Sequence, residues 1–355
     1  MKIAIRKSLL ESMLVNLQPF LEKKDNSQIT SHICLDAHHG RLIVKATDYE
    51  MGLRLESEFA GIEEEGSATA NGKKLLDIIK ILKDEDVRLT TSDDHLVIKQ
   101  KGASYKLPMF HANDFPSFPD SSTLSSINLD TDKLVISLKK IIPAIDTNNP
   151  KFELNGALID MKTSGINLVG TDTRRLAIVF MADQSDQELS LIIPKKAITE
   201  IQKLFNEPAR IHYDNATLII STQTTYFFTR LINGKYPDYQ RILPKEFRHD
   251  FTVERDRFLE AMKQVSVIAP EIKMTFSAQA ITFESLSSEN IEAKSEMEFT
   301  SDLPGDFTIA VNSRYLTDFI ASLESREFHI KLNQPNTPFQ LESGNFVTII
   351  MPIIL

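Results

Sequence analysis

The segment Thr171-Asp172-Thr173-Arg174-Arg175-Leu176 places one carboxylate beside two guanidinium groups. Arginine pairs readily with phosphate oxygens, and a carboxylate can serve as a base or nucleophile. A phosphoester hydrolase that uses Asp172 with Arg174 or Arg175 is therefore one interpretation. Because strand-like runs flank the segment, an ordinary charged hairpin is the other, and both stay open at this point.

No other stretch has the spacing of a catalytic or metal-binding motif. Residues 66–74 resemble a phosphate-binding loop, but five residues separate the glycines where four are needed, and Lys74 stands where a serine or threonine must reach magnesium. His38-His39 have no partner at ligand spacing. Cys34 is the only cysteine, which excludes an intrachain disulfide and a cysteine-rich zinc site. We expect no catalytic residue, no metal and no cofactor.

The element around which the rest of the chain is organised is a short basic helix. In residues 71–83, Leu75, Ile78, Ile79 and Leu82 have the i, i+3, i+4, i+7 spacing of an apolar helix face, while lysines stay off that face. The pattern predicts a helix that packs on a sheet with one side and offers a basic side to its surroundings.

This strand-then-basic-helix pattern recurs at intervals of 57 to 66 residues. Six copies are marked by Lys7, Lys73, Lys133, Lys195, Arg257 and Arg314. A fixed period indicates repeats, and one unit with a single apolar face must pair with another to close a core. We expect an α+β protein of three repeated domains, each with two helices packed on antiparallel sheets. The expected domains are residues 1–122, 123–246 and 247–355.

Charge is segregated along the chain. The formal net charge is −9, with an estimated pI of 5.5, and that acidity alone argues against a nucleic-acid partner. The six predicted helical segments nevertheless sum to +9, which leaves −18 for the remainder. Solvated lysines explain any one helix, whereas the whole set favours a surface that faces phosphates.

Hydropathy places the chain among soluble proteins. Hydrophobic residues make up 42% and charged residues 25%, and no apolar run is long enough to cross a bilayer. The first residues lack the apolar core of a secretory signal. We expect a cytoplasmic protein.

Three segments together are similar to one family. They are residues 171–176, the string Tyr-Pro-Asp-Tyr-Gln-Arg-Ile-Leu-Pro at 236–244, and the tail at 349–355. With them the chain resembles the DNA sliding clamp, the beta subunit of bacterial DNA polymerase III, over its whole length. The resemblance implies the DNA clamp architecture, a homodimer joined head to tail into a ring around duplex DNA. It implies a DNA replication processivity factor without catalytic activity, whose hold on DNA is independent of base sequence.

The resemblance also implies a cleft for short linear motifs of the replicative polymerase, the clamp loader and repair proteins. By motif matching its residues are Leu154, Thr171, Thr173, Arg174, Arg175, Leu176, Pro237, Arg241, Ile242, Asn312, Tyr315, Ile349, Met351, Pro352 and Ile353. Thr173-Arg174 stand where the family usually has Gly-His, and Ile354 stands where it often has Arg.

Two further surfaces follow from the same matching. The DNA-facing candidates are Lys24, Lys80, Asn148, Asn149 and Lys196. The head-to-tail contact would bring Tyr105 and Leu107 near Val267 and Ile268. A linear scaffold that binds the same peptides without closing is the remaining alternative.

Overall fold

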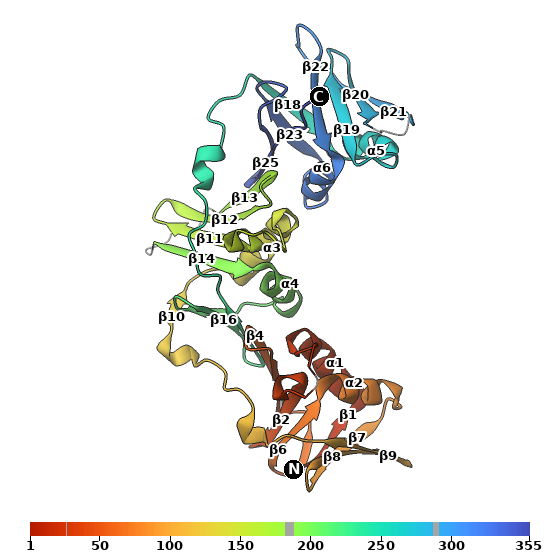
Figure 1. Cartoon of the computed structure of the whole chain (residues 1–355), viewed down its shortest axis with the longest axis vertical. Helices are drawn as coiled ribbons and strands as arrows, with labels where there is room; N and C mark the ends of the chain where they lie inside the picture. The colour runs from red at the N-terminus through yellow and green to blue at the C-terminus, as the bar shows by residue number, and fades with distance from the viewer. Residues whose placement is uncertain (26, 182–187, 287–290) are drawn as a thin grey trace. The chain divides into compact units, whose positions relative to one another are not determined.

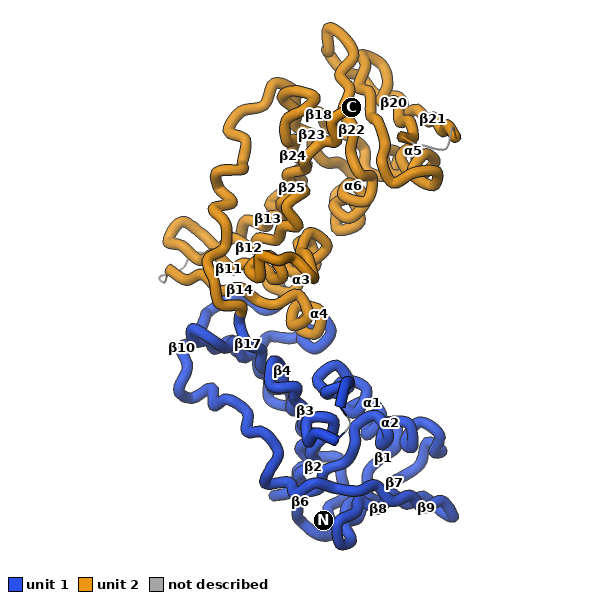
Figure 2. Tube along the Cα trace, in the orientation of Figure 1, with its two compact units in different colours: residues 1–132, 203–231 blue, residues 133–202, 232–355 orange. Residues whose placement is uncertain are grey.

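The computed structural model describes residues 1–25, 27–181, 188–286 and 291–355. Within them the chain forms two compact units, coloured separately in Figure 2. Unit 1 contains residues 1–132 and 203–231, and unit 2 contains residues 133–202 and 232–355.

All six predicted helices are present, and each comes shortly after a strand. Their bounds are α1 Lys7–Leu17, α2 Gly72–Ile81, α3 Thr131–Ile141, α4 Lys195–Leu204, α5 Arg255–Ser266 and α6 Ser313–Ile320. In Figure 1, α1 and α2 lie side by side in unit 1, and α5 and α6 do so in unit 2. The six-fold recurrence read from the sequence is thus a recurrence of structure.

The buried face of α2 differs in part from the predicted one. Leu75, Leu76 and Ile79 are buried, whereas Leu82 lies at the C-cap and is only half-buried. Asn71 caps the helix, its side chain accepting a hydrogen bond from the Lys74 N–H. The helix therefore ends one residue before Leu82, so the last periodic residue falls at its C-cap.

Unit 1 contains two antiparallel sheets. The five-stranded sheet has the order β5-β1-β7-β8-β9. Its strands are β1 Lys2–Arg6, β5 Gly61–Glu64, β7 Asp86–Ser92, β8 His95–Gln100 and β9 Ala103–Pro108. The eight-stranded sheet has the order β10-β15-β16-β17-β4-β3-β2-β6. Its strands are β2 His32–His38, β3 Arg41–Thr47, β4 Met51–Ser57, β6 Gly66–Asn71, β10 Ser125–Ile127, β15 Arg210–Tyr213, β16 Thr217–Ser221 and β17 Thr225–Arg230.

Unit 2 repeats this plan. Its eight-stranded sheet has the order β14-β11-β12-β13-β25-β24-β23-β18, and its four-stranded sheet the order β21-β20-β19-β22. The strands of the larger sheet are β11 Gly156–Lys162, β12 Gly165–Thr171, β13 Arg175–Met181, β14 Leu189–Pro194, β18 His249–Glu254, β23 Glu327–Leu332, β24 Phe339–Ser343 and β25 Phe346–Ile350. Those of the smaller sheet are β19 Glu271–Phe276, β20 Ala280–Ser285, β21 Lys294–Glu298 and β22 Phe307–Asn312.

The same strand pairing joins the two halves of each large sheet. In unit 1, β17 pairs with β4 so that Thr225 faces Leu55; in unit 2, β25 pairs with β13 so that Phe346 faces Val179. Both Thr225 and Phe346 open the second strand of a hairpin whose loop has two residues. These pairings join strands from neighbouring expected domains into one sheet, which is why the compact units do not follow the predicted boundaries.

Aromatic clusters fill the core of each unit. Phe227 makes edge contacts with Phe20 and Phe205 in unit 1, with ring centroids 6.0 and 6.3 Å away. In unit 2, Phe258 makes edge contacts with Phe283 and Phe328, at 5.1 and 5.4 Å. Full burial of one such side chain stabilises the fold by roughly 1.5–3 kcal/mol. No helix among the described residues is long and apolar enough to cross a membrane.

Candidate functional site

The hairpin between β12 and β13 in unit 2 is built by its own polar side chains. The Thr171 hydroxyl donates to the Arg175 carbonyl at 2.6 Å and accepts from the Thr173 N–H at 3.2 Å. The Asp172 Oδ1 accepts from the N–H groups of Arg174 and Arg175, both at 3.0 Å. Thr173 occupies the left-handed region, with φ of +72°. The hairpin tip is therefore fixed before any ligand arrives.

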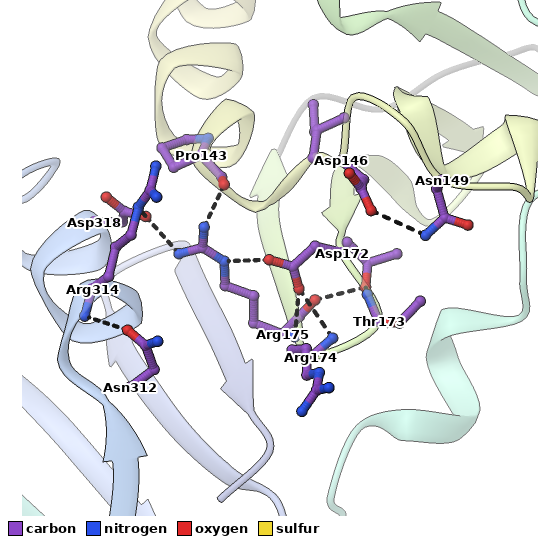
Figure 3. A network of polar contacts seen from close by, with 12 residues as sticks. Pro143, Asp146, Asn149, Asp172, Thr173, Arg174, Arg175, Asn312, Arg314 and Asp318 are labelled. Atoms are coloured by element: carbon purple, nitrogen blue, oxygen red, sulfur yellow. Dashed lines mark hydrogen bonds and ion pairs between the residues drawn. The ribbon is translucent and has the colours of Figure 1, made fainter. Parts of the chain in front are cut away.

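Arg175 ties this hairpin to α6 and to the segment after α3 (Figure 3). Its Nε lies 3.0 Å from Asp172 Oδ2 and its Nη1 lies 2.7 Å from Asp318 Oδ2, while Nη2 donates to the Pro143 carbonyl. The guanidinium also stacks over the Tyr315 ring at 4.5 Å. The Arg175 side chain is only 5% exposed, so it stabilises the hairpin from the interior of the protein.

These contacts weaken the hydrolase interpretation. Both oxygens of Asp172 are engaged, one by backbone N–H groups and the other by Arg175. A base or nucleophile needs a free lone pair aimed at its substrate. Asp172 and Arg175 instead form the hairpin's internal scaffold, and no group of three or more His, Cys, Asp or Glu side chains that could hold a metal is present among the described residues.

The chain's last residues run beside the hairpin. The Met351 N–H, immediately after β25, donates to the Arg174 carbonyl at 2.9 Å, and the Ile353 N–H donates to the Ala310 carbonyl at 2.8 Å. Met351 is 46% exposed. The tail therefore has a fixed backbone and an apolar side chain that remains open to solvent.

An apolar cluster lies under the hairpin and the tail. It contains Leu154, Leu158, Val169, Leu176, Ile178, Ile192, Tyr236, Tyr239, Val347 and Ile349. Leu154 comes from the 3-10 helix Phe152–Asn155, and the two tyrosines come from the segment that leads into the 3-10 helix Tyr239–Ile242. Ile242 is 46% exposed at its margin.

Tyr239 holds the connecting segment in place. Its hydroxyl donates to Asp160 Oδ2 at 2.6 Å and accepts from the Asn167 amide at 2.9 Å. Burial, together with the carboxylate of Asp160, raises the pKa of the phenol to about 12. The neutral Tyr239 therefore keeps this wall of the site fixed at ordinary pH.

The structure brings together most of the residues proposed for the cleft. Leu154, Leu176 and Ile349 share the apolar cluster, and Met351 pairs with the hairpin tip. Asn312 caps α6, accepting from the Arg314 N–H, close to Tyr315 in the same helix. The exposed margin is formed by Pro237 and by Arg241, whose Nε pairs with Asp238 at 2.8 Å.

Sequence reasoning missed two residues of the site. Asp318 and Pro143 complete the Arg175 network, yet neither lies near the hairpin in sequence. Asp318 follows Arg314 by four residues and Tyr315 by three, so all three residues lie on the same side of α6. That spacing was the only available signal.

The DNA-facing candidates occupy exposed loops and helix ends within their own units. Lys24 and Lys80 are exposed in unit 1, and Lys196 is exposed near the start of α4. Asn149 is half-buried and bonded on both sides, its amide donating to Asp146 and its backbone N–H donating to Asn155. Asn149 therefore shapes its loop, next to the exposed Asn148.

The predicted contact residues between protomers differ in exposure. Val267 and Ile268, after α5, are 78% and 39% exposed. Leu107 is 7% exposed and belongs to the core of unit 1, whereas Tyr105 is half-buried. Both lie on β9, the end strand of its sheet. The expected apolar patch is thus clear after α5 and less so on β9.

Comparison with known proteins matches the whole length of the chain. Family models of the DNA polymerase III beta subunit match at residues 1–119 for the N-terminal domain, 128–238 for the central domain and 240–353 for the C-terminal domain. A beta sliding clamp of Helicobacter pylori strain J99 is 39% identical, with all of both chains covered. One of Caulobacter vibrioides is 29% identical over 95% of each chain. The crystal structure of the Helicobacter pylori beta clamp bound to a DNA ligase peptide has a TM-score of 0.94, 39% identity and full coverage of both chains.

Proposed function

Because the chain belongs to the DNA polymerase III beta subunit family, we propose that it holds its partner proteins by short peptide segments bound at the site in unit 2. It is a non-catalytic processivity factor, a sliding clamp that tethers the replicative polymerase and other proteins to duplex DNA. The hydrolase alternative is not favoured.

One arrangement carries the proposal for the peptide site. Met351 is held by the hairpin through its backbone, and its side chain is open to solvent two residues after Ile349, which pairs with Leu176 in the apolar cluster. A preformed apolar surface with a polar margin suits one or two anchor side chains of a linear motif. Such binding is specific but exchangeable, as a protein that serves several partners in turn requires. A DNA ligase peptide bound to the Helicobacter pylori relative supports this use.

The internal repeat supports head-to-tail assembly of two copies. Strands β4 and β13 each pair with the second strand of a following hairpin, β17 or β25. In the remaining copies of the repeat, β21 is equivalent to β4 and β13, and β9 is equivalent to β17 and β25. Both β21 and β9 are end strands of their sheets. An end strand presents backbone groups that a second chain can pair with. We infer that β9 of one copy pairs with β21 of another. If the register is the same as between β17 and β4, where Thr225 lies opposite Leu55, Ala103 lies opposite Ser295.

Closure of such a dimer would make strong DNA affinity unnecessary. A ring retains duplex DNA topologically, so the excess positive charge of the helical segments need only guide phosphates, without base contacts. Lys24, Lys80, Asn148 and Lys196 are the proposed contacts. We place the protein in the cytoplasm, where replication takes place in bacteria, and we propose that its domains span residues 1–122, 123–246 and 247–355.

Loading on circular DNA tests the assembly. The protein should elute as a dimer and, with a clamp loader and ATP, remain on nicked circular DNA until the circle is linearised. A strict monomer that is never retained would contradict the ring. Peptide binding without retention would indicate the linear scaffold instead.

Substitution of the apolar surface tests the peptide site. Met351→Ala with Leu176→Ala should weaken binding of a labelled DNA ligase peptide about 30-fold, since two anchor contacts of roughly 1 kcal/mol each are lost. Ile81→Ala is the control, because Ile81 is 71% exposed on α2 in unit 1. Met351→Ala alone keeps the test valid if loss of the buried Leu176 disturbs folding. Undiminished binding would show that the peptide sits elsewhere.

A further inference from the structure

Arg174 differs from the other arginines near this site in its ion pairing. Arg175 pairs with Asp172 and Asp318, and Arg241 pairs with Asp238. The Nε of Arg314 lies 3.9 Å from Asp318. Among the residues that the structure describes, Arg174 has no carboxylate within 4 Å of its guanidinium group.

The backbone of Arg174 is nevertheless fixed on both sides. Its N–H donates to Asp172 at 3.0 Å, and its carbonyl accepts from the Met351 N–H at 2.9 Å. Its side chain is exposed and points away from the Arg175 network, as Figure 3 shows. A cation is therefore held one residue from the hairpin's buried scaffold, next to the open Met351 side chain.

Charges of both signs lie near this cation, but the acidic one closest in sequence is already engaged. Burial and then the Asp172 carboxylate raise the pKa of the nearby Tyr315 phenol, while Arg175, Arg174 and Arg314 act in the opposite direction. Asp172 is already engaged by Arg175, so it offers Arg174 only its contact with the backbone N–H. A carboxylate brought by a ligand would meet a cation that has no competing carboxylate among the described residues.

We propose that Arg174 selects partner segments that carry an aspartate or glutamate beside the apolar anchor. This inference rests on the peptide site proposed above. When an anchor side chain covers Met351, the adjoining residues of the bound segment come close to the Arg174 guanidinium, which can pair with a carboxylate there. An exposed pair of this kind contributes roughly 0.2–1 kcal/mol, and partial exclusion of water by the bound peptide places the pair toward the upper end of that range. The expected preference for an acidic over a neutral peptide is about three- to fivefold.

The test uses labelled synthetic peptides based on the DNA ligase segment, with aspartate or asparagine at each of the two positions on either side of the anchor. Fluorescence polarisation with the full-length protein should show a three- to fivefold preference for aspartate at one or more of these positions. Raising the salt concentration should reduce it, because an exposed ion pair is screened. Arg174→Gln should abolish the preference, so that this variant binds the aspartate and asparagine peptides equally.

Two further variants separate charge from structure. Arg174→Lys should retain part of the preference, because the positive charge stays at the same place. Arg88→Gln should leave the preference intact, because Arg88 is an exposed arginine of β7 in unit 1, outside the peptide site. A preference that survives in Arg174→Gln, or equal binding of all peptides by the parent protein, overturns this inference alone. Failure of every peptide to bind would overturn the peptide site as well.

Discussion

The hairpin between β3 and β4 in unit 1 has the same hydrogen bonds as the hairpin between β12 and β13 in unit 2, where we propose the peptide site. The Thr47 hydroxyl donates to the Met51 carbonyl at 2.7 Å and accepts from the Tyr49 N–H at 3.0 Å. The Asp48 Oδ1 accepts from the N–H groups of Glu50 and Met51, at 3.1 and 2.8 Å. Tyr49 has φ of +71°, against +72° for its counterpart Thr173.

In each unit, the strand that pairs with the second strand of this hairpin, β17 or β25, also leads to the same hydrogen bond to the hairpin loop. The Arg230 N–H donates to the Glu50 carbonyl at 2.7 Å, just as the Met351 N–H donates to the Arg174 carbonyl at 2.9 Å. These hydrogen bonds form the same backbone frame twice: residues 47–51 with Arg230 in unit 1, and residues 171–175 with Met351 in unit 2. It cannot by itself explain why one junction offers an apolar surface.

The side chains beside each frame account for the difference. Gly52 in unit 1 faces Phe228, where Leu176 in unit 2 faces Ile349. A Cβ atom at Gly52 would lie 2.2 Å from the Phe228 ring, so that ring occupies the space of the missing side chain. In unit 2 the two branched aliphatic residues form part of the cluster under the hairpin instead.

Aromatic and cationic side chains complete the cover in unit 1. The Phe118 ring lies 4.9 Å from the Phe228 ring, edge to face, and the Tyr226 hydroxyl donates to the Pro119 carbonyl. The Arg54 guanidinium lies over the Tyr226 ring at 4.8 Å. The repeated fold thus supplies the frame twice, and side-chain chemistry alone leaves one copy open.

The largest expected difference is that acid should destabilise unit 1 more than unit 2. His32 opens β2 where Gly156 opens β11, each opposite the last residue of the strand before a helix. Burial, with a smaller effect of Lys74, lowers the pKa of His32 to about 4, and its Nδ1 has no hydrogen-bond partner among the described residues. Because the folded pKa lies below the unfolded value of about 6.5, the stability from neutral His32 is complete above pH 6.5. It is lost as the pH falls toward 4, by about 3 kcal/mol.

Hydrogen exchange measured at pH 7 and pH 4.5 checks this expectation. Amides of unit 1 should lose protection more than those of unit 2, and His32→Gln should remove much of the excess loss. Equal loss of protection in both units, unchanged in that variant, would refute it.

Exchange of one residue between the frames should weaken unit 2. Arg175 stands where unit 1 has Met51, which is 2% exposed. Arg175→Met keeps an apolar stem but leaves Asp172 without its cation and Asp318 with only the more distant Arg314, so we expect a loss of roughly 2–3 kcal/mol in the free energy of unfolding. Urea denaturation measures it, with Arg241→Met as the exposed control. A neutral result would mean that Arg175 contributes little beyond packing.

Gly52→Ala should strain the closed frame. The added methyl group meets the Phe228 ring, and displacement of the ring from Phe118 should cost roughly 1–2 kcal/mol. Thermal unfolding measures the loss, and Gly102→Ala is a matched control because a Cβ there would meet no atom within 4 Å. If both variants unfold alike, Phe228 does not depend on the absent side chain.

A smaller gain should come from filling a cavity in unit 1. Thr225 lines a cavity of about 750 Å³ with Met13 and Leu55, at the position where unit 2 has the buried Phe346. Thr225→Phe should raise the free energy of unfolding by about 1 kcal/mol, and Thr225→Ser should not. A melting temperature lowered by the phenylalanine would show that the cavity cannot take the ring.

Local patterns predicted the helices well, because apolar spacing and basic residues recur six times. Pro19 ends α1 early by opening a short 3-10 helix, Gln18–Phe20, and Leu76 proved to be on the buried face of α2. The first change shortens a helix by about one turn, and the second changes only which residues of a helix are buried. Both hairpins contain a Thr-Asp pair, at 47–48 and 171–172, but the same pair also occurs at 131–132 and 317–318, so it does not identify them.

The site was harder to predict, because its parts meet only in space. The resemblance to the clamp family supplied the hairpin and the tail, whereas Asp318 and Pro143 are joined to Arg175 by folding alone. The closure of the other frame depends on Phe228 leaning over Gly52, a contact between residues 176 positions apart. No local pattern encodes such a pairing.

The bond between the Met351 N–H and the Arg174 carbonyl has a mechanical consequence. A partner that pulls on the tail loads this bond together with the pairing of β25 to β13, so several parallel hydrogen bonds share the force before any one of them breaks. Drag from a moving polymerase would then be borne by the whole large sheet of unit 2 rather than by a dangling end.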